Sequence, residues 1–284
     1  MNTPINRRTF LKVAAGAMVI GATGIAAAPR ASALGPVLGT VIDYAAGVPS
    51  AASIKAAGHL GAVRYVSQPR PGTEKNWMLG KPVTLAETRS FESHGLKTAS
   101  VYQFGKADNA DWLNDAAGAA THAPQAIALH VAAGGPTGRP IYVAIDDNPS
   151  WNQYANQIRP YLQAFRVALE SAGYRLGIYG NYNVIDWAVN DGLGEFFWMH
   201  DWGSEGRIHP RATLHQIRID KDTLDGVGID INNVYAHDWG QWTPGEVIDG
   251  VIPSIPDYQY PAPDSPLNPQ AITDLMKLLG NLSS

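Results

Sequence analysis

The sequence contains no cysteine, so no disulfide supports the fold and the hydrophobic core must hold it alone. It also lacks an H-E-x-x-H motif, a G-x-S-x-G motif and a P-loop, and so gives no support for a zinc protease, a serine hydrolase or a nucleotide-binding enzyme. The acidic segment 220–226 misses the spacing of an EF-hand calcium loop. We therefore expect neither a metal nor another cofactor.

Residues 1–33 carry the features of an export signal. Arg7 and Arg8 form a twin-arginine pair, residues 13–28 form a short apolar run rich in Gly and Ala, and Ala-Ser-Ala at 31–33 fits a cleavage site. These features predict a Tat signal peptide over residues 1–33 and secretion to the cell envelope. The alternative is an uncleaved N-terminal membrane anchor. After cleavage we expect no stable membrane span.

The remaining chain is acidic. Residues 1–33 contain four of the 21 Lys and Arg residues and no Asp or Glu, which leaves 17 basic and 25 acidic residues and a formal charge of −8. This charge argues against nucleic acid and against anionic membrane surfaces as partners. Removal of 33 of the 284 residues leaves 251, the usual size of a single α/β barrel, and we expect a monomer.

Strand-like and helical segments alternate along the chain. We predict strands at 38–44, 61–67, 97–104, 140–146, 175–181, 195–201, 212–217 and 226–232. This order predicts right-handed βαβ units, a parallel sheet and an α/β fold that closes as a (β/α)₈ TIM-like barrel over residues 34–242. The last two repeats lack clear helices, so we expect the barrel to be irregular there.

Capping residues and prolines set the expected limits of the helices. Thr84, with Glu three residues later, begins one helix with a capping box, and Ser150 begins another that Pro160 interrupts. The long helical segment 111–135 is expected to break at Pro124. Residues 243–284 are rich in proline, and we expect an extended tail with a short terminal helix. This tail is either disordered or docked on the barrel.

Three aspartates fall at predicted strand ends. In the strand 140–146 the aliphatic side chains alternate with a second set that ends at Asp146, which we place at the C-terminal rim of the barrel, where active sites of such barrels lie. Asp43 and Asp230 end the first and last strands, which are neighbours in a closed barrel. Paired carboxylates, one protonated and one ionised, perform glycoside hydrolysis. We therefore predict catalytic roles for Asp43, Asp146 and Asp230, with surface caps as the alternative.

Other residues near the predicted strand ends are candidates for substrate binding. Sugar rings stack on aromatic faces, although aromatic side chains also fill cores. Arg64 is unusual in a buried strand, and we expect it to pair with Asp43, as a structural ion pair or as a substrate clamp. Asp147 could instead cap a turn, and a lone histidine is often structural. The candidates are Arg64, Tyr102, Asp147, Tyr179, Trp198, His200 and Gln216.

Five segments of the chain resemble one family closely. They are VIDYAAGVPSAASIKAAGHLGAVRYVS from residue 41, NWMLGKP from 76, YVAIDDNPS from 142, IDWAVNDGLG from 185 and GVGIDIN from 226. Over residues 36–242 the chain resembles Tat-exported actinobacterial proteins that carry a glycoside-hydrolase-like domain of unknown function. The resemblance implies a TIM-like barrel related to the family 25 lysozymes, at the cell envelope.

The lysozyme pattern is only partly present. The resemblance matches its aspartate on the first strand to Asp43 and its aspartate on the last strand to Asp230. The lysozymes have Asp-x-Glu at the end of strand four, where this chain has Ala144-Ile145-Asp146, so one acid is missing and the other is one methylene shorter. A carboxyl displaced by about 1 Å can cost on the order of a hundredfold in rate.

Two functions remain open from the sequence. The first is an exported glycoside hydrolase acting on peptidoglycan or another cell-wall polysaccharide, with Asp146 as acid and Asp43 or Asp230 as base or nucleophile. The second is a non-catalytic barrel that has lost the lysozyme acids and binds an envelope glycan, or has a regulatory role, through the same mouth.

Overall fold

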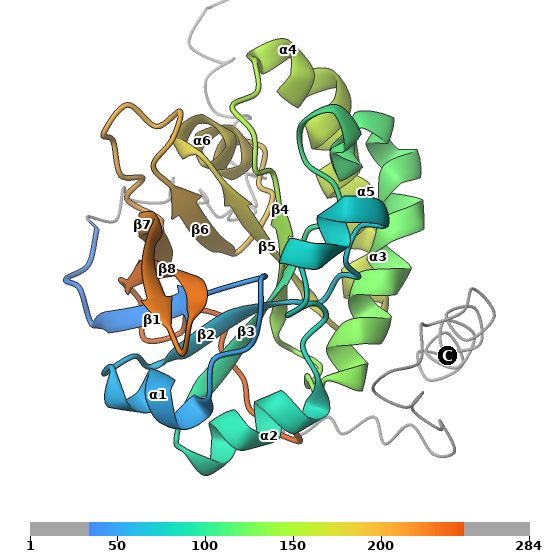
Figure 1. Cartoon of the computed structure of the whole chain (residues 1–284). Coiled ribbons are helices and arrows are strands. Elements are labelled where there is room, and N and C mark those ends of the chain that lie inside the picture. Colours follow the sequence, from blue (N-terminus) through green and yellow to red (C-terminus); the bar gives the residue numbers. More distant parts are fainter. Residues whose placement is uncertain (1–33, 247–284) are drawn as a thin grey trace, which may run out of the picture. The chain divides into compact units, whose positions relative to one another are not determined.

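The computed structural model describes residues 34–246 (Figure 1). The predicted signal peptide at 1–33 and nearly all of the predicted tail at 243–284 lie outside the described residues. No helix within the described part is long and apolar enough to cross a membrane.

Eight strands close into a barrel in the order of the sequence, as predicted. The neighbouring strands pair in parallel from β1 to β7, but β8 runs antiparallel to both β7 and β1. The expectation of a wholly parallel sheet was therefore wrong at the last strand. The strands are β1 Gly39–Asp43, β2 Gly61–Tyr65, β3 Lys97–Tyr102, β4 Pro140–Ala144, β5 Arg175–Gly180, β6 Phe196–His200, β7 Leu214–Leu224 and β8 Val227–Val234.

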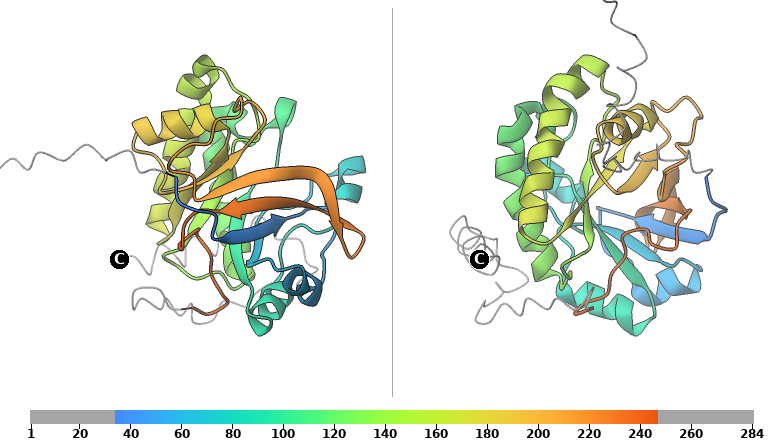
Figure 2. Two further views of the ribbon diagram at one scale, coloured as in Figure 1. Left: turned by 90° about the vertical axis from the view of Figure 1, so that its left-hand side faces the viewer. Right: turned by 180° about the vertical axis from the view of Figure 1, so that it is seen from behind.

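A hairpin replaces the last helix. Strands β7 and β8 are joined at Asp225 and Gly226, which both have positive φ, as a tight two-residue hairpin turn requires. The left view of Figure 2 shows this ribbon extending beyond β1. Its tip is fixed to the start of α1, because Asp225 accepts hydrogen bonds from the Ser50 N–H at 2.8 Å and the Ser53 hydroxyl at 2.7 Å. The predicted irregularity of the last two repeats is confirmed.

Helices cover the outside of the barrel, and α3 and α5 pack side by side next to β4 and β5 (Figures 1 and 2). A π-helical turn, Tyr154–Ile158, precedes Pro160, so the predicted interruption is confirmed. The predicted break at Pro124 is wrong, because α3 continues through it on a buried face of alanines and Ile127. The α-helices are α1 Ala51–Ala56, α2 Leu85–Ser93, α3 Asp115–Ala132, α4 Trp151–Gln153, α5 Arg159–Ser171 and α6 Tyr182–Asn190, and the short 3₁₀ turns are Gly72–Trp77, Ala107–Asn109 and Asp111–Asn114.

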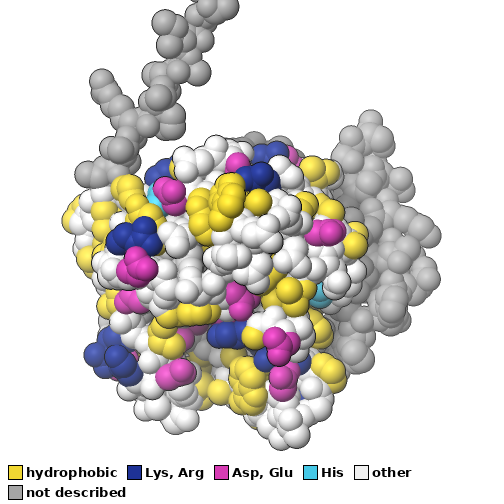
Figure 3. Space-filling model, turned by 90° about the horizontal axis from the view of Figure 1, so that it is seen from above, with side chains coloured by type: hydrophobic (Ala, Val, Ile, Leu, Met, Phe, Trp, Pro, Cys, Tyr) yellow, Lys and Arg dark blue, Asp and Glu magenta, His cyan; other side chains and the backbone are white. Residues whose placement is uncertain are grey.

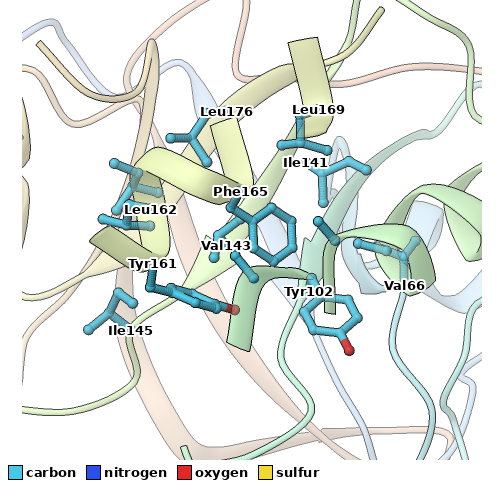
Figure 4. Close-up of a cluster of buried hydrophobic side chains, with 14 of the residues drawn as sticks. Val66, Tyr102, Ile141, Val143, Ile145, Tyr161, Leu162, Phe165, Leu169 and Leu176 are labelled. Atoms are coloured by element: carbon cyan, nitrogen blue, oxygen red, sulfur yellow. The ribbon is translucent and has the colours of Figure 1, made fainter. Parts of the chain in front are cut away.

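Alternation along the strands divides the core into two layers. Ile141, Val143 and Ile145 pack outward against helical residues such as Phe165 (Figure 4). Tyr142 and Ala144 belong to the cluster inside the barrel, as the sequence predicted. Strand β4 therefore directs alternate side chains to the helices and to the barrel interior.

The chain after β8 closes the N-terminal end of the barrel. Trp239 packs in the interior cluster, and its carbonyl accepts a hydrogen bond from the Tyr142 hydroxyl at 2.7 Å. Trp242 pairs with Thr98 at the start of β3, and its indole N–H donates to the Ser100 hydroxyl at 3.2 Å. With this end sealed, the interior opens at the C-terminal ends of β1 to β6.

Candidate active site

A cavity of about 820 Å³ lies at this open end of the barrel. Among the described residues that line it are four aspartates and one lysine. The aspartates come from β1, β7, β8 and the loop after β4: Asp43, Asp220, Asp230 and Asp146. The structure thus brings the three aspartates predicted from the sequence into one cavity. Their catalytic role remains a prediction.

Asp43 and Asp230 are direct cross-strand partners in the antiparallel β1–β8 pair. Asp230 lies within β8 and not at its end, because the antiparallel β7–β8 hairpin extends past the end of β1. The Gln216 side-chain nitrogen donates to one oxygen of each carboxylate at 3.0 Å, so these two oxygens are separated by no more than twice that distance. The two carboxyl groups therefore form one interacting pair.

A network of amides and aromatic side chains fixes this pair. The Gln216 carbonyl oxygen accepts a hydrogen bond from the Tyr179 hydroxyl at 2.9 Å. The Asn232 side chain donates to Asp43 at 2.8 Å, and its own oxygen accepts from the Trp198 indole at 2.6 Å. Sequence reasoning missed Asn232, although the two-residue period of its strand places it on the same face as Asp230.

Burial alters the protonation of the pair. Asp43 is only 3% exposed, and its burial, together with the charge of Asp230, raises its pKa to about 8 against the opposing hydrogen bonds from Asn232 and Gln216. Burial also raises the pKa of Asp230 to about 6, opposed by the backbone N–H of Asp220. At neutral pH we therefore expect one proton on the pair, carried by Asp43, which has the higher pKa.

Asp146 lies on the other side of the barrel, since β2 and β3 separate its strand from β1. The Lys106 ammonium forms an ion pair with its carboxylate at 2.7 Å, and the Gln103 side chain donates to the same oxygen at 3.1 Å. Sequence reasoning missed both residues. For Gln103 the period of its strand would have sufficed, because Val101 and Gln103 both line the cavity.

Aromatic side chains form much of the cavity wall. Tyr179 and Trp198, both predicted, line it with their ring centres 4.3 Å apart. Trp77 and Trp202 at the rim are 52% and 40% exposed, and Tyr65 lies deeper. Exposed aromatic faces of this kind can stack on sugar rings. Trp77 was not predicted, because its segment gives no strand signal.

Two predicted binding residues face away from the cavity. Arg64 is fully buried outside the barrel, and its partner is Glu87 of α2 at 2.5 Å, so the predicted pairing with Asp43 is wrong. Tyr102 packs among the helices, and its hydroxyl bonds His122 at 2.7 Å. Alternation explains both, because Tyr65 and Val101, one position away, occupy the inward positions.

Two others lie near the cavity without lining it. Asp147 faces a separate hollow of about 400 Å³ and accepts a hydrogen bond from the Trp112 indole at 2.9 Å. His200 is buried between the rings of Tyr179 and Trp202, and this burial lowers its pKa to about 4, which keeps the imidazole neutral. Within residues 34–246, no three His, Asp or Glu side chains are grouped to hold a metal ion.

Three comparisons with known proteins, by family model, by sequence and by structure, point to the same family. Residues 52–234 match the family described as "Rv2525c-like, glycoside hydrolase-like domain". A Mycobacterium tuberculosis protein named "Putative peptidoglycan hydrolase Rv2525c" is 51% identical over 244 residues, which are 84% of this chain and 99% of the relative. Crystal structures of the M. tuberculosis Tat-secreted protein Rv2525c, in complex with L-tartrate and with HEPES, are 53% and 51% identical. Each superposes with a TM-score of 0.68 over 72% of this chain, covering 100% and 99% of theirs.

Proposed function

Because the chain belongs to the Rv2525c-like family of glycoside hydrolase-like domains, we propose that it hydrolyses glycosidic bonds in peptidoglycan or another polysaccharide of the cell envelope. The relative from M. tuberculosis is Tat-secreted and is named for peptidoglycan hydrolysis. This chain carries the twin arginines Arg7 and Arg8 and is likewise exported to the cell envelope.

The observation that carries the proposal is the unequal state of the carboxyl groups across one cavity. Glycoside hydrolysis needs a protonated carboxyl to donate to the leaving oxygen and an ionised carboxylate near the anomeric carbon. Asp43 is buried beside Asp230, which raises its pKa, whereas Asp146 across the cavity is ion-paired with Lys106. This arrangement supports an acid and a carboxylate that face each other across one cavity.

We therefore assign the general acid to Asp43. Its proton passes to the glycosidic oxygen as the bond to the anomeric carbon breaks, while the Asp146 carboxylate stabilises the positive charge on the sugar. Water then attacks the anomeric carbon and gives a proton to the ionised Asp43, which restores the acid. This assignment exchanges the roles expected from the sequence, where Asp146 was the acid. The reason lies in the contacts, because Asp146 is paired with the Lys106 ammonium at 2.7 Å, whereas Asp43 is buried beside Asp230.

The aromatic wall supports the choice of substrate class. Trp77 and Trp202 offer open ring faces at the rim, and Tyr179 and Trp198 continue the wall inward. Nucleic acid is a poor fit, since the described charged residues that line the cavity are four aspartates and one lysine. On the face shown in Figure 3, Lys and Arg side chains are interspersed with Asp and Glu and do not merge into one basic surface.

The proposal is tested by release of reducing sugars from purified cell-wall fractions, with the mature protein and its Asp43→Asn and Asp146→Asn variants. General acid catalysis contributes about 10²- to 10⁴-fold, so the activity of Asp43→Asn should fall by at least about a hundredfold, and that of Asp146→Asn should fall as well because it removes the stabilising charge. Tyr142→Phe, altered below the cavity, should retain activity. No release by the wild type would overturn the proposal.

Two observations favour the second candidate, a barrel that binds glycan without cleaving it. Asp43 is nearly inaccessible, and Ala144 stands where the lysozyme pattern has an acid. Sedimentation with insoluble peptidoglycan separates the two functions. Retained binding by the wild type and both asparagine variants, with no sugar released, would establish the binding barrel.

A further inference from the structure

Gln216 occupies a special place between the two paired carboxyl groups. Its side chain is buried, and its three hydrogen bonds join Tyr179, Asp43 and Asp230. A glutamine amide has one accepting end and one donating end, and either end can point toward a given partner. Here the Tyr179 hydroxyl takes the accepting end, so the donating end must face the carboxylates.

The two carboxyl groups are satisfied unequally. Asp230 accepts an N–H donor on each oxygen, because the Asp220 backbone N–H binds Oδ1 at 2.8 Å and Gln216 binds Oδ2 at 3.0 Å. Asp43 accepts two donors on Oδ2 alone, from Asn232 at 2.8 Å and Gln216 at 3.0 Å. Within the described residues, no hydrogen-bond partner is found for its Oδ1. Of the four oxygens of the pair, Oδ1 of Asp43 is therefore the best placed to carry a proton.

We propose that Gln216 is a positioning residue that, by donating to Oδ2 of Asp43, keeps the proton of this carboxyl group on Oδ1, and that Tyr179 keeps the Gln216 amide in the donating orientation. Its catalytic consequence rests on the proposed hydrolysis, since the proton on Oδ1 is the one that Asp43 would donate. The arrangement itself does not depend on turnover.

Loss of the Tyr179 hydroxyl would free the Gln216 amide to rotate. After rotation the Gln216 oxygen, and not its nitrogen, would face the carboxyl groups. It would accept a hydrogen bond from a protonated carboxyl group, and the donor to the carboxylate would be lost. Hydrogen bonds to charged groups are strong enough that losing one should raise a carboxyl pKa by about one pH unit. Other charged or titratable groups facing the pair are Asp146, Asp220, Asp222 and Tyr65, with Lys106 bound to Asp146.

The test is titration of the aspartate carboxyl carbons by ¹³C NMR in the mature protein, with assignments from Asp43→Asn and Asp230→Asn. In the wild type Asp43 should titrate at a higher pH than Asp230. Tyr179→Phe and Gln216→Met should both raise the pKa of Asp43 by about one pH unit. Tyr142→Phe is the matched control, because its hydroxyl lies in the same barrel interior but bonds Trp239 and Thr213, and it should leave both titrations unchanged.

Unchanged titrations in both Tyr179→Phe and Gln216→Met would overturn the positioning role, as would a wild-type Asp43 that titrates like an exposed carboxyl. Because the titration needs no turnover, it stands even if no sugar is released. If sugar is released, Tyr179→Phe should move the alkaline limb of the pH–rate profile up by about one pH unit, with KM nearly constant. If sugar is released but neither variant changes the titration of Asp43, the hydrolase function stands and the positioning role of Gln216 is refuted.

Discussion

The buried ion pair between Arg64 and Glu87 gives a sharp prediction about stability. Arg64 is 0% exposed, and its guanidinium donates to Glu87 at 2.5 Å and to the backbone carbonyls of Tyr44 and Gly80 at 2.6 Å each. Glu87→Gln removes the only carboxylate found bonded to Arg64 in the described part of the chain, and leaves the guanidinium charge buried without compensation. Breaking such a pair costs about 3–5 kcal/mol.

For a domain of this size, that loss corresponds to a fall of about 6–20 °C in Tm, since 1 kcal/mol shifts Tm by about 2–4 °C. Thermal and denaturant unfolding of the mature protein measure it. Glu195→Gln is the matched control, because Glu195 pairs with Arg175 at 3.3 Å on the surface and should lose under about 1 kcal/mol.

The reasoning would be refuted if Glu87→Gln lost no more stability than Glu195→Gln. A second arm separates charge from packing. In the double variant Arg64→Met, Glu87→Leu no charge is buried, so much of the lost stability should return. The same variants should still sediment with cell-wall glycan, because Arg64 lies outside the barrel and does not line the cavity.

Three further predictions concern the cavity. The rate should fall as pH rises through about 8, because activity requires a protonated Asp43, and a constant rate from about pH 7 to 9 would contradict the assignment. Asp43→Asn should stabilise the fold at pH 8. The folded wild type keeps a proton on Asp43 that the unfolded chain loses above about pH 4, so its free energy of unfolding falls as pH rises from about 4 to 8. Equal Tm values for both proteins at pH 8 would argue against a buried acid. Trp77→Ala and Trp202→Ala should each weaken glycan binding by about 3- to 10-fold in sedimentation assays, whereas Trp151→Ala, exposed but outside the cavity lining, should not.

The barrel and the meeting of three aspartates could be predicted because both follow from local periodicity. Strand four illustrates this, since its alternation places Ile141 and Val143 outward and directs Asp146 to the mouth. The direction of the last strand could not be predicted in the same way. Its Asp-Gly turn was read as part of an acidic loop, although such a turn between two apolar runs also predicts a hairpin.

The partners of individual side chains depended on tertiary contacts that the sequence does not display. Arg64 was assigned to Asp43 because their strands are neighbours, but an outward residue on β2 meets α2 and therefore Glu87. Lys106 reaches Asp146 from a loop whose path is fixed by Asp111, which accepts the backbone N–H groups of Phe104 and Gly105. Neither contact leaves a periodic signal.

Hydrolysis of peptidoglycan in ¹⁸O-labelled water, followed by mass spectrometry of the soluble fragments, tests the central claim most directly. We predict fragments with one ¹⁸O at each new reducing end for the mature wild-type protein, and at least about a hundredfold less for Asp43→Asn. Equal labelling by both proteins would remove Asp43 as the acid. No labelled fragment from either would contradict hydrolysis at this cavity.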